Sequence, residues 1–143
     1  MLYNENMVFG VEALDIKTAG SASIYAGQVN GGKASAGDAK AIDIGKATGV
    51  YKDQYYARIE CVEEVEGTAN VKFKFHFLEA EDSADTKSSV ELIVPASALN
   101  EAKRTPLEVS LPSIAGRYCR LEVSADASLT KGVVIVAIEP TRW

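Results

Sequence analysis

The segment Val71–Phe77 constrains the fold of this chain more than any other, because apolar and polar residues alternate along it without a break. In an extended strand successive side chains point to opposite faces. The apolar face consists of Val71, Phe73, Phe75 and Phe77, and the polar face of Lys72, Lys74 and His76. This pattern is typical of a strand with one face on a core and the other in water.

Shorter runs of the same kind recur to the end of the chain, and no long amphipathic helix is present. Strands are expected within 39–44, 55–62, 71–78, 90–94, 107–111, 119–123 and 133–138, and a further short strand at 8–11. About eight short strands with polar turns predict an all-β fold, an antiparallel jelly-roll-like sandwich. The turn at 67–70 predicts that strands 55–62 and 71–78 form an antiparallel hairpin. The last strand is apolar on both faces, as a central or interface strand would be.

At 143 residues the chain fits one domain. Residues 18–37 are rich in Gly, Ala and Ser and contain Tyr25 as their only aromatic residue. Such a composition anchors little core. We therefore expect residues 1–37 to form an irregular N-terminal arm and loops, which a neighbouring subunit would order, and residues 38–143 to form the β-sandwich.

Charge and hydropathy exclude several classes of partner. The net charge of −5 argues against nucleic acid, because affinity for a duplex rests on Lys and Arg that neutralise phosphates. No stretch of about 18 apolar residues exists, so no membrane span is expected. The acids concentrate in residues 60–91, where nine stand against three lysines. This segment is either a solvated face or an acidic face that docks on a basic partner.

A phosphate-binding loop is the first catalytic motif to test. Residues 27–33 match the spacing of a Walker A loop up to Lys33, but Ala34 stands where the motif needs a Ser or Thr hydroxyl for magnesium. The residues that follow begin no helix to hold a phosphate at its N-terminus. The segment is better interpreted as a turn, and we expect no nucleotide cofactor.

Other reactive residues lack the partners that chemistry requires. His76 is the only histidine, so a surface or interface position is favoured over a metal site or a catalytic triad. Cys61 and Cys119 are in phase with core residues, which favours buried thiols and leaves a disulfide as the alternative. The acidic residues Glu79, Glu81, Asp82 and Asp85 lack EF-hand spacing and favour a solvated loop over a weak calcium site. We therefore expect no enzyme, no cofactor and no bound metal.

The order of short motifs from residue 39 onwards resembles that of the jelly-roll capsid cement (head decoration) proteins of tailed bacteriophages. The match begins with Ala41–Gly45, an Ile-Asp-hydrophobic-Gly strand, and continues after a hairpin with Leu111–Pro112. It ends with Arg117–Leu121 and the closing strand Gly132–Ile138. The resemblance covers residues 39–139, and its motifs are a strand rhythm with a few fixed residues.

The resemblance implies a structural virion protein that binds the outside of the assembled shell and bridges capsid subunits. Its partners would be the major capsid protein and two further copies of itself in a homotrimer, and it would be made in the cytoplasm of the host bacterium. The apolar closing strand also favours self-association. A carbohydrate- or receptor-binding β module of a phage tail or fibre is the alternative.

Aromatic side chains and the closing strand supply the candidate interface residues, because amphipathic aromatic residues suit protein interfaces. The cluster Tyr51, Tyr55 and Tyr56 fits a binding surface about as well as it fits packing at the edge of a core. The residues expected at a capsid or subunit interface are Tyr3, Phe9, Tyr25, Tyr51, Tyr55, Tyr56, Val134, Val136 and Trp143.

Overall fold

The structure is a computed structural model of the chain, and it describes residues 8–10, 13–20, 22–27, 39–44, 55–80, 88–99, 107–111 and 117–140. These residues form short 3-10 helices, among them η2 (Lys17–Gly20) and η4 (Ala96–Ala98), and nine strands. The strands are β1 (Leu14–Asp15), β2 (Ile24–Ala26), β3 (Ile42–Asp43), β4 (Tyr55–Glu66), β5 (Asn70–Leu78), β6 (Ser88–Pro95), β7 (Leu107–Leu111), β8 (Tyr118–Ala125) and β9 (Lys131–Pro140). No helix within the described ranges has the length and apolarity to cross a membrane.

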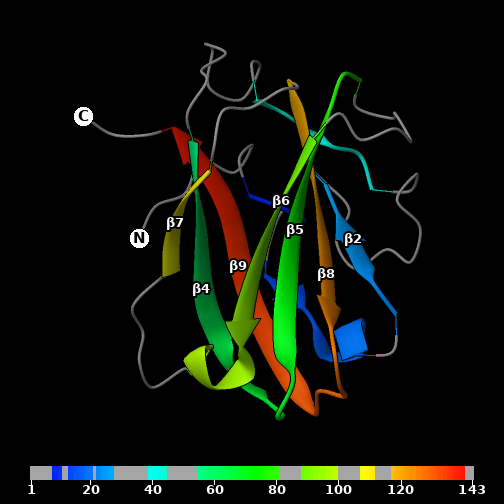
Figure 1. Cartoon of the computed structure of the whole chain (residues 1–143), viewed down its shortest axis with the longest axis vertical. Helices are drawn as coiled ribbons and strands as arrows, with labels where there is room; N and C mark the ends of the chain where they lie inside the picture. Colours follow the sequence, from blue (N-terminus) through cyan, green and yellow to red (C-terminus); the bar gives the residue numbers. More distant parts are fainter. Residues whose placement is uncertain are drawn as a thin grey trace.

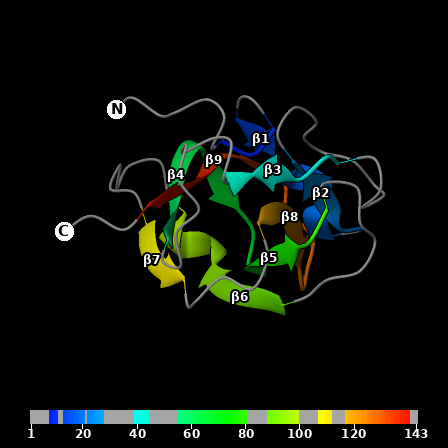
Figure 2. The same ribbon diagram turned by 90° about the horizontal axis from the view of Figure 1, so that it is seen from above.

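The strands form two antiparallel sheets that pack face to face (Figure 1). The first sheet has the order β1-β9-β4-β7, and the second has the order β2-β8-β5-β6, with β3 also paired to β8. Figure 2 shows the two layers end-on, with β6 and β7 on one side of the sandwich and β1 and β2 on the other.

This strand order is that of a jelly roll. With β3 set aside, the chain changes sheet at every connection except the β5–β6 hairpin. Two sheets whose strands interleave in this way are the double Greek key of jelly-roll domains. The predicted all-β, jelly-roll-like sandwich is therefore confirmed.

Strand β5 shows why this sequence forms a sandwich. The four apolar side chains of its inner face are buried, and the three polar ones of the other face are partly exposed. The neighbouring strand β8 alternates in the same phase, with Phe73 opposite Val123 and Phe75 opposite Leu121. The first sheet supplies the other half of the core, chiefly from Ile59, Val134, Val136 and Ile138.

The predicted hairpin between strands 55–62 and 71–78 is wrong. Strand β4 pairs with β7 and β9, and β5 pairs with β6 and β8, so the two strands lie in opposite sheets. The short connection after β4, which contains Gly67 at a φ of 148°, crosses between the layers. The apolar faces of the two strands therefore meet across the core, which buries both of them.

The division at residue 37 also needs correction. Strand β1 pairs with β9 and β2 pairs with β8, so residues expected to form an arm contribute one strand to each sheet. Phe9 and Ile16 are fully buried, and Phe9 donates a backbone hydrogen bond to the carbonyl of Val136. The few large apolar residues of this segment are spaced so that they reach the core. Residues 1–7 and 28–37 lie outside the described residues.

Strand β9 is a central strand, as its apolar sequence predicted, but it does not present a bare apolar face. Its inward residues Val134, Val136 and Ile138 fill the core. On the other face Ala137 is also fully buried, in a bridge with Val8, and Val133 and Ile135 are half-buried. Strand β9 therefore gives little support for a homotrimer.

The end of β2 requires a glycine. A Cβ atom on Gly27 would lie 1.4 Å from the carbonyl oxygen of Lys40, which is a backbone atom that cannot rotate away. At Gly132 the nearest atom to such a Cβ would be the Val65 side chain, at 2.9 Å. A side chain yields more easily than a backbone.

We expect Gly27→Ala to lower the free energy of unfolding by about 1 to 3 kcal/mol, because the chain must move to admit the methyl group. Gly132→Ala is the matched control and should cost less. Urea unfolding of both variants measures the difference. A larger loss in the control would contradict the tight approach between Gly27 and Lys40.

Candidate interaction surface

The strand register defines a polar surface on the outward face of the second sheet. Across β6, β5, β8 and β2 the side chains form rows, because directly paired residues project to the same side. One row contains Ile93, Lys72 and Ser124, and the next contains Glu91, Lys74, Glu122 and Tyr25. We call this outward face of the second sheet, β2-β8-β5-β6, the sheet-B surface.

Oppositely charged side chains alternate along the sheet-B surface. Glu91 lies 3.9 Å from the ammonium of Lys72 and 3.6 Å from that of Lys74. All three side chains are partly exposed, so these contacts add little to stability. They do keep the surface close to neutral, with cations and anions interspersed.

Glu122 is the centre of a hydrogen-bond network between β8, β5 and the segment that leads into β2. Its carboxylate accepts a hydrogen bond from the hydroxyl of Ser23 at 2.9 Å, and its other oxygen lies 2.9 Å from Nε2 of His76. Burial alone would raise the pKa of Glu122, but the hydrogen bonds from His76 and Ser23, with the charges of His76 and Lys74, lower it. The network ties the residue before β2 to β8 and β5.

Ionised Glu122 should therefore stabilise the fold, and this contribution should depend on pH. Its pKa is lower in the folded chain than its ordinary value of 4.5. The stabilisation is thus present above about pH 4.5 and is lost as the pH falls through the folded pKa. We expect Glu122→Gln to be less stable than the parent protein at pH 7 and the difference in stability to be smaller at pH 3. Urea unfolding at both pH values measures it, and a difference that stays constant would contradict the network.

Tyr25 and Arg120 lie beside this network. Partial burial raises the pKa of the Tyr25 hydroxyl, the charge of Glu122 raises it further, and Arg120 opposes both effects. Arg120 is itself buried, and its Nε donates a hydrogen bond to the carbonyl of Ala39 at 2.8 Å. The guanidinium therefore helps to fix the chain before β3 against β8.

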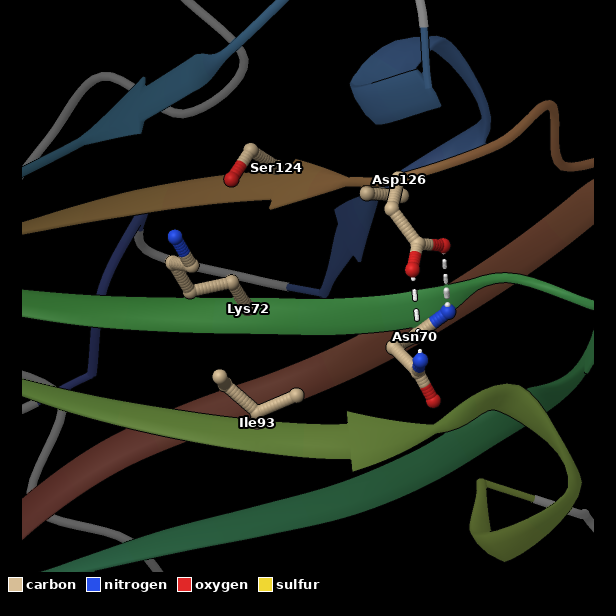
Figure 3. A pocket seen from close by; sticks show the side chains of 6 residues that line it. Asn70, Lys72, Ile93, Ser124 and Asp126 are labelled. Carbon is tan, nitrogen blue, oxygen red and sulfur yellow. Dashed lines mark hydrogen bonds between the residues drawn. The ribbon is translucent and has the colours of Figure 1, made fainter.

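A shallow hollow of about 340 Å³ lies at one end of the sheet-B surface (Figure 3). Its lining residues are Asn70, Lys72, Ile93, Ser124, Ala125 and Asp126. Asp126 accepts two hydrogen bonds from Asn70, one from the backbone at 2.8 Å and one from the side-chain amide at 3.2 Å. Ile93 is 59% exposed and forms an aliphatic wall among these polar groups. The hollow thus offers donors, acceptors and a small apolar area.

The outward face of the first sheet carries a smaller polar cluster. The hydroxyl of Tyr56 donates a hydrogen bond to Glu139, and Arg58 lies 3.1 Å from Glu108 and 3.8 Å from Glu139. The Nε atom of Arg58 is buried without a hydrogen-bond partner. The charges of this cluster are satisfied largely within the sheet.

The structure separates the predicted interface residues into three groups. Phe9, Tyr55, Val134 and Val136 are buried in the core, and their assignment to an interface is wrong. Tyr25 and Tyr56 are partly exposed, on the outward faces of the second and first sheets respectively. Tyr3, Tyr51 and Trp143 lie outside the described residues.

The other candidates for chemistry form neither a disulfide nor a metal site within the described residues. Cys61 and Cys119 form no disulfide; Cys119 is buried as predicted, whereas Cys61 is only partly buried. Burial, partly opposed by Arg120, raises the pKa of Cys119 far above its ordinary value. Among the described residues no group of three or more His, Cys, Asp and Glu could hold a metal ion. Residues 28–34 of the phosphate-loop motif, together with Glu81, Asp82 and Asp85, are outside the described ranges.

No family model matches the chain, and no curated protein matches it in sequence. Among solved structures, it is similar to a chain of an expanded equine rhinitis A virus particle, a picornavirus capsid. The TM-score is 0.38 and the sequence identity 13%, over 94% of this chain and 67% of that chain. This similarity is too low to show a family or a function, and the jelly roll rests on the strand order itself.

Proposed function

We propose that this chain is a structural protein of a phage virion that binds the outside of the assembled capsid and reinforces it by bridging capsid subunits. The strand order carries the proposal, because a jelly roll is the fold that the resemblance to capsid cement proteins implies. The matching segments Arg117–Leu121 and Gly132–Ile138 lie at the start of β8 and in β9, one interior strand of each sheet, with Arg117 directly before β8. No catalytic role is part of the proposal.

The physical mechanism is mass action. A ligand that binds the assembled shell and not its free subunits stabilises the shell by RT ln(1 + [L]/Kd) at each site, where [L] is the concentration of free ligand. The sheet-B surface suits such a role, because its interspersed charges favour a polar protein surface over a polyanion. Linking several copies would strengthen weak contacts through a high effective concentration. A homotrimer would provide this link, and the resemblance is what supports it.

Co-sedimentation with capsids tests the function. The purified chain is mixed with expanded shells and, separately, with unassembled major capsid protein. We expect binding to the shells and a higher melting temperature of the shells, with little binding to the free subunits. Absence of the chain from the shell pellet, or melting that it leaves unchanged, would contradict the proposal.

The hollow on the sheet-B surface favours the alternative, a carbohydrate- or receptor-binding β module. Side-chain donors and acceptors beside an aliphatic residue match the hydroxyls and C–H groups of a sugar. A glycan array probed with the parent protein and with Lys72→Ala tests it. Binding that the variant loses would favour this alternative, and an array without signal would count against it.

A further inference from the structure

Strand β6 forms an edge of the second sheet. It pairs with β5 along eight residues and with none of the other described strands. An edge strand of this length presents a row of backbone N–H and C=O groups that can pair with another strand. Pro95, which cannot donate a backbone hydrogen bond, stands only at its last position.

The side chains of β6 are also incompletely covered. Val90 and Leu92 face the core, opposite Phe75 and Phe73, yet both remain partly exposed. On the outward face Ile93 is more exposed than any other large hydrophobic residue in the described ranges. A strand added beside β6 would cover apolar area on both faces of the sheet.

We propose that β6 pairs antiparallel with β6 of a second copy of this chain, about a twofold axis at Leu92. The inward residues read Val90, Leu92, Val94, which is the same in both directions from Leu92. A twofold interface requires such self-complementarity, because each copy contributes the same patch. In this register Leu92 faces its own counterpart, and Val90 faces Val94 of the second copy.

Charge selects this register. It places Glu91 of one copy opposite Ile93 of the other, so that Glu91 enters the row that contains Lys72. A carboxylate thus joins a row with a cation, and its aliphatic stem covers Ile93. A register centred on Glu91 would instead place two carboxylates directly opposite each other, which is unfavourable.

Sedimentation equilibrium over about 5 to 500 µM tests the pairing, since weak edge interfaces dissociate in the micromolar range. We expect the mass of a dimer at the upper concentrations. A monomer throughout, or a trimer, would overturn the proposal. The measurement needs no capsid, so it does not test binding to the shell. A dimer would take the place of the homotrimer as the form that links several copies.

A charge exchange tests the register. Ile93→Glu places a carboxylate opposite Glu91 of the second copy, twice in each dimer, and should raise the dissociation constant at least tenfold. Within one copy the new carboxylate faces Lys72, so the fold should be retained, which urea unfolding checks. Adding Glu91→Lys to Ile93→Glu should restore the dimer.

Val62→Glu is the matched control, because Val62 is a second exposed apolar residue, 44% exposed, and lies on β4. It should leave the dimer unchanged. A dimer that Ile93→Glu does not weaken, a double variant that stays monomeric, or equal effects of Ile93→Glu and Val62→Glu would each overturn the proposal.

Discussion

Phe75→Ala is expected to lower the free energy of unfolding by about 3 to 5 kcal/mol, the usual cost of removing a buried aromatic side chain. Phe75 is fully buried on β5, and its ring centroid lies 5.9 Å from that of Phe9. The substitution therefore removes contacts with both β8 and the segment before β1. Urea or thermal unfolding of the purified variant measures the loss.

Ile93→Ala is the control for this prediction, because Ile93 lies in the same sheet but projects into solvent. At a concentration where the protein is monomeric it should change stability by no more than about 0.5 kcal/mol. A Phe75→Ala variant that loses less than about 1 kcal/mol would mean that the ring does not belong to the core.

Removal of residues 1–23 is expected to abolish cooperative unfolding. The deletion takes away Phe9, Leu14 and Ile16, each buried in the core, together with the strand that covers one edge of β9. At about 2 to 5 kcal/mol for each large side chain, the sum approaches the whole stability of a typical domain. The truncated chain should show no unfolding transition in circular dichroism on heating.

Two point variants test whether the deletion destabilises the fold through its buried side chains or only because the chain is shorter. Ile16→Ala should cost about 2 to 5 kcal/mol, whereas the exposed neighbour Asp15→Ala should cost less than about 1 kcal/mol. A truncated protein that melts at the temperature of the full chain would show that this segment is an arm after all.

The alternation in the sequence predicted correctly which side chains face the core, but it did not predict which strands lie next to each other. It placed the side chains of β5 correctly, because the two-residue period of a strand is a local property. It could not say that β4 and β5 belong to different sheets, because a short turn can join strands within one sheet or across two. Whether the two strands share a sheet depends on which other strands pair with each of them, and most of these strands lie far along the chain.

Strands β1 and β2 escaped prediction because they are too short to show a period. Two or three residues do not distinguish a strand from a loop, and their surroundings are rich in small residues. What holds them in place is pairing with β9 and β8, more than 90 residues away in the sequence. The spaced residues Phe9, Leu14, Ile16 and Ile24 were the available signal.

The interface prediction was wrong where it relied on residue type and ignored the two-residue period that places side chains on one face of a strand. Tyr55 is in phase with Ala57 and Ile59, and Val134 is in phase with Ile138, so their burial could have been foreseen. Glu122 and Ser23 were missed, because nothing in the sequence brings together two residues 99 positions apart. His76 was correctly expected on the polar face, and its partner became evident only from the strand register.

The interleaved order of the strands has a consequence for how the chain acquires its structure during synthesis. Strand β1 needs β9, and β2 needs β8, so neither sheet can close until residues 118–140 have been made. Among the described strands, only the β5–β6 hairpin joins two that are consecutive in the chain, and it is the first pair that can form. Folding should therefore be slow and occur late, on the millisecond-to-second scale of proteins dominated by distant pairings. Until then the early apolar segments remain open to wrong partners, which makes chaperone binding to the nascent chain an expected part of its production.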